Sequence, residues 1–201
     1  MPTHTPRATR APRATTLLDE VDRLMDRLPG VRFEVIGGEI RVTPLPDGAH
    51  GCVLTDLTLL FMEAGLHAGN RRVLQKLAVW LPTGPYDFAI PDLALTDDFD
   101  GHLVEYNCYD PAIFRLALEV TSNNYGNELD TKVAAYASAE IPVYVILNRR
   151  DDCLHVLTDP RHGTYRSHRI HHPGERVTLP ASVGATVQLD VAALLDGARH
   201  G

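Results

Sequence analysis

Two carboxylates interrupt apolar stretches of this 201-residue chain and could carry chemistry. Asp92 lies near the start of the run IPDLALTD, and Glu119 lies within RLALEVTS. An unpaired carboxylate in a buried strand costs several kcal/mol of desolvation, so such groups are usually paired or bind a metal. If the two runs are neighbouring strands, Asp92 and Glu119 form a hard-oxygen site suited to Mg²⁺ or Mn²⁺.

The neighbouring residues support this hypothesis, although ordinary explanations stay open. Alternate residues of a strand share a face, so Ala94 and Ala117 are small neighbours that leave space beside the two carboxylates. Against a metal site, an aspartate after proline is more typical of a turn. Glu119 could equally face solvent or pair with Arg115.

Lys132 is a third candidate because lysine is rare in this chain. Among the 19 basic residues, Lys76 and Lys132 are the lysines and the rest are arginines. A compact ammonium beside a metal can stabilise a phosphoryl oxyanion or orient a water molecule. The alternative is a helix-surface ion pair with Glu128, four residues earlier.

The rest of the sequence predicts the elements that position these residues. Apolar residues at helical spacing indicate helices in TTLLDEVDRLMDRLPG, in HGCVLTDLTLLFMEAGLHAG and over residues 128–139. Alternation on both sides of Gly37-Gly38 predicts a β-hairpin with a primed turn. Further strands are expected in RRVLQKLAVWLP, FAIPDLALTD, IFRLALEVTS, PVYVILN, DCLHVLTD and the start of VQLDVAALLDGARHG, which then continues as a short helix. This α/β (α+β) pattern predicts a mixed central β-sheet flanked by helices. We expect one domain over residues 15–201, after a disordered basic tail at residues 1–14.

Composition restricts the class of protein. The net charge of −7 argues against a general polyanion binder. The chain has no long apolar stretch and its N-terminus no secretory h-region, so we expect a cytoplasmic protein without a membrane partner. The three cysteines form no CxxC pair, and the segment HVLTDPRHGTYRSHRIHH lacks metal-ligand spacing, which argues against zinc. We interpret its histidines as surface residues of a late hairpin.

The order of four motifs resembles the restriction endonucleases grouped as the Uma-two family, within the PD-(D/E)XK nuclease superfamily. The motifs are FEVIGGEIRVTPLP, IPDLALTD, LALEVTS and DTKVAAYASAEIPVYVIL, within about residues 30–195. The resemblance implies a restriction-endonuclease-like fold, with Asp92 and Glu119 as metal ligands. Thr121 stands where the lysine of an E-x-K motif would be, and the resemblance implies that Lys132, from the following helix, is the catalytic lysine.

The resemblance also suggests Glu39, on the second hairpin strand, as a further catalytic acid. Gln75 is a weaker candidate. His50 is interpreted as a helix cap or surface group, and Tyr136 as a core residue that could also line the pocket. The chain departs from the family pattern in EVTSNN and at Asn148, where the family often has an aspartate.

These inferences predict a Mg²⁺- or Mn²⁺-dependent endonuclease that hydrolyses phosphodiester bonds of nucleic acid, with DNA favoured and a homodimer left open. Candidates for phosphate contacts are Arg71, Arg72, Arg149 and Arg150, with the arginines of the tail. Two alternatives remain. One is a catalytically inactive module with a nuclease fold that binds nucleic acid or has a regulatory role. The other is a small-molecule hydrolase that uses the histidines of the segment HVLTDPRHGTYRSHRIHH.

Overall fold

The computed structural model describes residues 16–121 and 127–197, with the side chains of residues 127–129 outside this description. The elements are α1 (Leu17–Arg27), β1 (Arg32–Ile36), β2 (Glu39–Thr43), α2 (Gly48–Glu63), β3 (Arg72–Gln75), β4 (Val79–Trp80), β5 (Phe88–Ala89), β6 (Leu93–Thr96), β7 (Leu103–Glu105), β8 (Cys108–Tyr109), η1 (Pro111–Ile113), β9 (Phe114–Thr121), α3 (Asn127–Ser138), β10 (Val143–Asn148), β11 (Cys153–Arg161), β12 (Thr164–His171), β13 (Arg176–Thr178), η2 (Ala181–Val183), β14 (Gln188–Asp190) and α4 (Val191–Gly197). The predicted tail at residues 1–14 lies outside the described residues.

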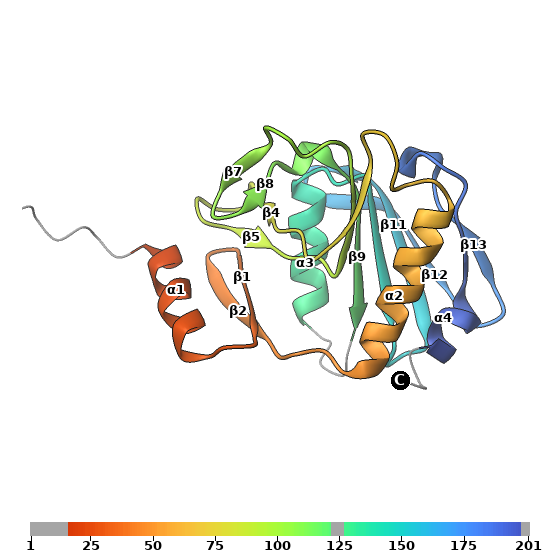
Figure 1. Cartoon of the computed structure of the whole chain (residues 1–201), viewed down its shortest axis with the longest axis horizontal. Helices are drawn as coiled ribbons and strands as arrows, with labels where there is room; N and C mark the ends of the chain where they lie inside the picture. Colours follow the sequence, from red (N-terminus) through yellow and green to blue (C-terminus); the bar gives the residue numbers. More distant parts are fainter. Residues whose placement is uncertain (1–15, 122–126, 198–201) are drawn as a thin grey trace, which may run out of the picture.

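A six-stranded mixed sheet, in the order β12-β11-β10-β9-β6-β3, carries the carboxylate strands. Its strand β9 runs parallel to β10 and antiparallel to β6. Leu116 and Leu118 of β9 pack in a core that includes residues of α2 and α4. On the other face, Ala117 packs in a core with Ala135 and Tyr136 of α3 (Figure 1). The predicted mixed sheet flanked by helices is therefore confirmed.

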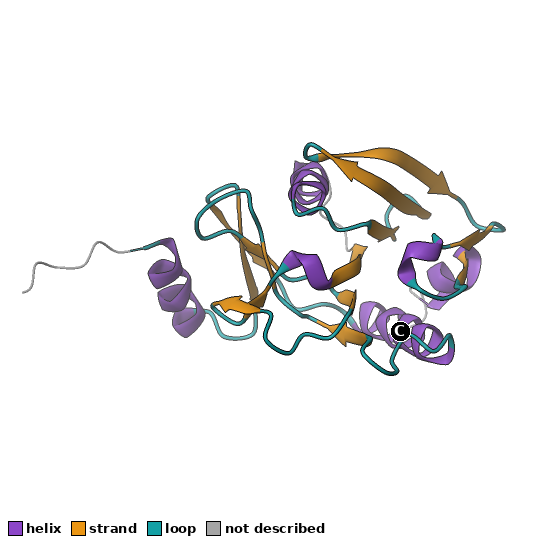
Figure 2. Ribbon diagram, turned by 90° about the horizontal axis from the view of Figure 1, so that it is seen from above, coloured by secondary structure: helices purple, strands orange, loops and turns teal. Residues whose placement is uncertain are grey.

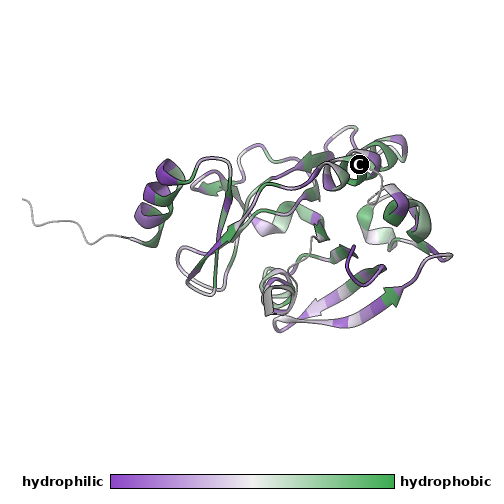
Figure 3. Cartoon of the chain, turned by 90° about the horizontal axis from the view of Figure 1, so that it is seen from below, coloured by the Kyte–Doolittle hydropathy of each residue, from purple (hydrophilic) through white to green (hydrophobic). Residues whose placement is uncertain are grey.

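A second six-stranded sheet, in the order β2-β1-β5-β4-β8-β7, adjoins the first. Its hairpin β1–β2 turns at Gly37 and Gly38, with φ of 63° and 74°, which is the left-handed geometry that a primed turn requires. Helix α1 is amphipathic (Figure 3) and packs Leu18 and Val21 against this sheet. Its N-terminus is closed by a capping box between Thr16 and Asp19.

Two predicted strands are each divided between the two sheets. RRVLQKLAVWLP gives β3 in one sheet and β4 in the other, and FAIPDLALTD gives β5 and β6 in the same way. Lys76, at the first break, has a φ of 56°, which interrupts the extended chain. Figure 2 shows how the chain crosses between the curved strand layers. The two breaks bring Lys76 and Asp92 together where the sheets meet.

Two local features differ from what residue type and strand alternation alone indicate. The polar segment DFDGHLVEYNCYDP, whose composition is typical of a turn, contains the short strands β7 and β8. Strand alternation would place Phe114 on the same face as Leu116, but Phe114 packs on the α3 side of the sheet. A register shift between Leu95 and Thr96, opposite this part of β9, accounts for the change of face.

The late hairpin is confirmed as β11 paired antiparallel with β12. The helices among residues 16–121 and 127–197 do not include one that is long and apolar enough to cross a membrane.

Candidate active site

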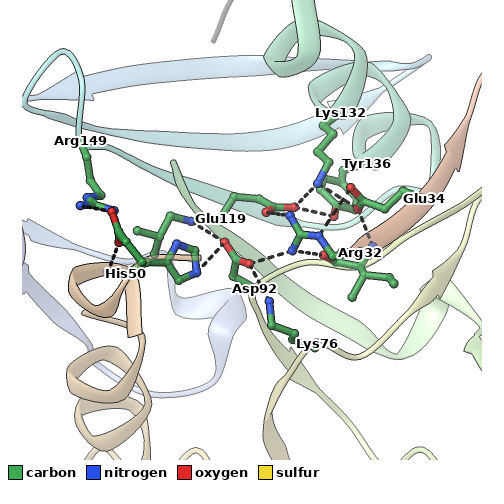
Figure 4. A network of polar contacts seen from close by, with 12 residues as sticks. Arg32, Glu34, His50, Lys76, Asp92, Glu119, Lys132, Tyr136 and Arg149 are labelled. Atoms are coloured by element: carbon green, nitrogen blue, oxygen red, sulfur yellow. Dashed lines mark hydrogen bonds and ion pairs between the residues drawn. The ribbon is translucent and has the colours of Figure 1, made fainter. Parts of the chain in front are cut away.

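Four segments bring a cluster of charged side chains together between the two sheets (Figure 4). Strand β1 supplies Arg32 and Glu34, the residue before β6 is Asp92, β9 supplies Glu119, and α3 supplies Lys132. The three carboxylates are almost fully buried, with exposed fractions of 1% for Glu34, 2% for Asp92 and 4% for Glu119. Their charges therefore have to be neutralised by contacts within the cluster.

Glu119 is held by α3. Its Oε1 accepts hydrogen bonds from Lys132 Nζ at 2.8 Å and from the Tyr136 hydroxyl at 3.2 Å. Burial raises the pKa of Glu119 to about 7, and the nearby charge of Lys132 opposes this rise. The alternative pairing is not observed, because Arg115 instead forms an ion pair with Asp97 at 2.6 Å.

Asp92 is held by three kinds of donor. Its Oδ1 accepts from Arg32 Nη1 at 2.8 Å, and its Oδ2 accepts from the backbone N–H of Val120 at 2.9 Å. Lys76 Nζ lies 3.5 Å from Oδ1. Burial favours the neutral acid, but the His50 contact and the charge of Arg32 outweigh it and hold the pKa of Asp92 well below its ordinary value. Asp92 is therefore ionised at neutral pH, and it lies at a bend of the chain directly before β6.

Lys132 lies between two carboxylates. Its Nζ is 2.8 Å from Glu119 Oε1 and 2.9 Å from Glu34 Oε1. Burial lowers the pKa of Lys132, but the two carboxylates outweigh burial and raise it above its ordinary value. The alternative partner, Glu128, has a side chain outside the described residues.

Arg32 bridges the two predicted metal ligands. Its Nη1 binds Asp92, and its Nη2 lies 3.8 Å from Glu119 Oε2. The same guanidinium donates to the carbonyl of Ile90 at 3.0 Å. The two carboxylates thus converge on a single cationic group.

The position of His50 differs from the predicted one, which was a helix cap or a surface group. Its backbone N–H does donate to Asp47, the N-cap of α2, at 2.8 Å. However, the imidazole is buried, and Nε2 lies 3.5 Å from Asp92 Oδ2. That contact is at the long limit of a hydrogen bond, and Nε2 has no closer hydrogen-bond partner among the described residues.

The structure brings Asp92, Glu119 and Lys132 together but leaves Glu39 and Gln75 outside the cluster. Glu39 is exposed at the hairpin, 3.6 Å from Arg41. Gln75 is exposed and donates to the Thr58 hydroxyl at 2.9 Å.

Four members of the cluster were missed as site residues: Arg32, Glu34, His50 and Lys76. Strand alternation could have placed Arg32 and Glu34 on one face of β1. Helical spacing could have placed His50 on the buried face of α2 with Val53 and Leu57, at i+3 and i+7. Tyr136 has both suggested roles, since its ring packs on Tyr144, with centroids 4.8 Å apart, while its hydroxyl reaches Glu119.

The donor set suits a hard divalent cation with a small number of protein ligands. Among the described residues there is no group of three or more histidine, cysteine or acidic side chains placed to hold a metal. Mg²⁺ is commonly held by one or two carboxylates, with water and substrate phosphate completing its shell. Asp92 and Glu119 fit this requirement because both already contact one cation, the Arg32 guanidinium.

Two arginines that were predicted to contact phosphate, and the histidines of the late hairpin, form contacts outside the carboxylate cluster. Arg71 donates to the carbonyl of Gly184 at 2.8 Å, and Arg149 binds Asp47 through two nitrogens, at 2.9 and 3.1 Å. His155 and His168 contact each other on the β11–β12 hairpin, with ring nitrogens 2.8 Å apart. The histidine tract thus belongs to a different part of the sheet from the carboxylate cluster.

Comparison with known proteins identifies first the type of fold and then the family. A crystal structure from Anabaena variabilis, titled as "a putative nuclease belonging to DUF820", is similar, with a TM-score of 0.65 and 14% sequence identity. The match covers 89% of this chain and 98% of that chain, so the fold is nuclease-like. The family model Uma2, described as "Putative restriction endonuclease", matches residues 18–192. The chain therefore belongs to the Uma2 family. No curated protein is significantly similar in sequence.

Proposed function

We propose that this protein is a metal-dependent endonuclease that hydrolyses phosphodiester bonds of nucleic acid, with DNA as the favoured substrate. The observation that supports this most is the meeting of Asp92, Glu119 and Lys132 in one buried cluster, with Lys132 Nζ 2.8 Å from Glu119. Membership of a restriction-endonuclease family agrees with it.

In this proposal Asp92 and Glu119 hold Mg²⁺ or Mn²⁺. When bound, the ion supplies Lewis-acid polarisation of a phosphate oxygen and a lowered pKa for a bound water. Lys132 keeps Glu119 oriented through their hydrogen bond and places a positive charge next to the reacting phosphate. Glu34, on the other side of Lys132, fixes the ammonium by a second contact at 2.9 Å.

A specific observation also favours the second candidate, an inactive nuclease-fold module that binds nucleic acid. Arg32, Lys76 and Lys132 balance the charges of Glu34, Asp92 and Glu119, so the cluster is neutral without any metal. Such a network could keep the fold after catalysis is lost.

Cleavage assays separate the two candidates. Single-stranded and duplex DNA and RNA are incubated with Mn²⁺ and either the wild type, Glu119→Gln or Glu63→Gln, the last being an exposed glutamate on α2. The endonuclease proposal expects cleavage by wild type and Glu63→Gln, and a loss of at least a hundredfold in Glu119→Gln. Nucleic-acid binding with no cleavage by the wild type would instead support the binding module.

A further inference from the structure

A cavity of about 290 Å³ opens beside Asp92, on the side away from Lys132. Its polar residues include Arg32, His50, Lys76 and Asp92. The cavity is lined by two cationic side chains, Arg32 and Lys76, and by one carboxylate, Asp92; Glu34 and Glu119, which also contact Arg32, do not line it. The cavity can therefore accept an anionic group beside the carboxylate.

The His50 imidazole indicates that the polar part of the cavity is incomplete. The residue is only 5% exposed, and among the described residues its Nε2 has no hydrogen-bond partner closer than the 3.5 Å contact with Asp92 Oδ2. A buried polar atom without a partner costs free energy, and a ligand oxygen at this place would supply the missing hydrogen bond.

The opposite wall is apolar. It is formed by the linker between β2 and α2, with Pro44, Leu45 and Pro46, and by Val31. Leu45 is 74% exposed, so its apolar surface is available to a ligand in the cavity. The ligand that suits this cavity has an anionic end for the Arg32 side and an apolar or planar body for Leu45.

We propose that the cavity is a nucleotide subsite, with the phosphate beside Arg32, Lys76 and His50 and the base against Pro44 and Leu45. This inference rests on the proposed function, because it places one nucleotide of the substrate next to Asp92. The volume is at the lower end of the range of roughly 300–1,000 Å³ for small-molecule sites, so it admits one nucleotide. A base within a duplex stack has to be extruded before it can enter such a cavity. The substrate class is therefore a strand with an unstacked nucleotide at the cleavage position: a single strand, a flap or an end.

Binding without metal tests the subsite directly. The full chain in EDTA is titrated with 5′-dTMP and with inorganic phosphate by calorimetry. We expect 5′-dTMP to bind at least tenfold more tightly than phosphate. Leu45→Asn should reduce 5′-dTMP binding at least fivefold and leave phosphate binding unchanged, because it removes apolar surface and no charge.

Leu59→Asn is the matched control, since Leu59 is an exposed leucine of α2, 52% exposed, and does not line the cavity. It should change neither affinity. Equal affinities for 5′-dTMP and phosphate, or equal effects of the two substitutions, would overturn the subsite.

Cleavage by the wild type with Mn²⁺ separates this inference from the proposed function. We expect a single strand to be cut at least tenfold faster than the same sequence in a duplex. If both are cut equally fast, the protein is a nuclease and the unstacked-substrate inference is overturned. If neither is cut while 5′-dTMP binds as expected, the subsite is supported and the endonuclease proposal fails.

Discussion

Replacing Lys132 by methionine tests the centre of the site, because it removes one buried charge and keeps most of the side-chain volume. The Lys132 side chain is 13% exposed, and its ammonium contacts Glu119 at 2.8 Å and Glu34 at 2.9 Å. Without it, two buried carboxylates lose a shared cation. Arg32 lies farther away, at 3.8 Å from Glu119 and 3.9 Å from Glu34, and compensates only in part.

Removing one partner of a buried ion pair costs about 3–5 kcal/mol of folding free energy. Glu119 can reduce this cost by taking up a proton, since its pKa is already raised to about 7. We therefore expect a loss of about 3 kcal/mol near neutral pH, at the lower end of that range. With a urea m-value of about 2–3 kcal/mol/M, the unfolding midpoint falls by about 1 M or more.

The sign of the pH dependence follows from Glu119. Its folded-state pKa lies above the ordinary 4.5, so the folded protein binds this proton more tightly than the unfolded chain. The free energy of unfolding contributed by this group therefore falls as pH rises through the window from about 4.5 to about 7. Without Lys132 the pKa rises further, so the destabilisation should be larger at about pH 8 than at about pH 5.5.

The assay is equilibrium urea unfolding at both pH values, with Lys76→Met as the matched control. Lys76 is the other lysine of the chain, its side chain is 46% exposed, and it contacts Asp92 at 3.5 Å. Because Lys76 is half-exposed and Asp92 keeps its closer contacts with Arg32 and the Val120 N–H, we expect Lys76→Met to cost less, about 1 kcal/mol. If both substitutions destabilised the protein equally, or if the Lys132→Met loss were independent of pH, the reasoning about the buried cluster would be refuted.

Three further predictions concern other charged groups. Glu34→Gln should lower kcat/KM for cleavage at least tenfold because it frees Lys132, while Glu39→Gln should change it less than twofold; a large loss in the second variant would return Glu39 to the site. Arg32→Met should tighten Mn²⁺ binding at least tenfold in calorimetry, since it removes the cation between the two metal ligands; weaker binding would show that Arg32 orders these ligands instead. Burial and the proximity of His168 lower the pKa of His155 below 6.5, so the unfolded chain binds this proton more readily and stability falls as pH drops through that value. His168→Gln should reduce the loss of unfolding free energy at acid pH, measured by urea unfolding. An unchanged pH dependence of stability would contradict this prediction.

The local elements could be predicted from the sequence because their causes are local. The spacing of Leu18 and Val21 with the cap at Thr16 defines α1, and the Gly37-Gly38 pair defines the hairpin. The carboxylates at 92 and 119 were recognisable as site candidates because desolvation makes such groups costly in apolar strands. The sequence by itself thus determined the helices and the hairpin, and it pointed to Asp92, Glu119 and Lys132 as candidate site residues, which the structure brings into one cluster.

Tertiary structure decided which other residues join them. Arg32 and Glu34 lie on a strand that looks half-exposed by alternation, but both faces of β1 are covered, one by α1 and the other toward α3. The chain also crosses between sheets at Lys76, which brings its ammonium to Asp92. These contacts join residues as far apart as 98 positions, as with Glu34 and Lys132, and periodicity carries no information over such distances. The charge balance of the site is therefore a property of the packed sheets, because burial brings the opposite charges close together and removes the water that would otherwise screen them.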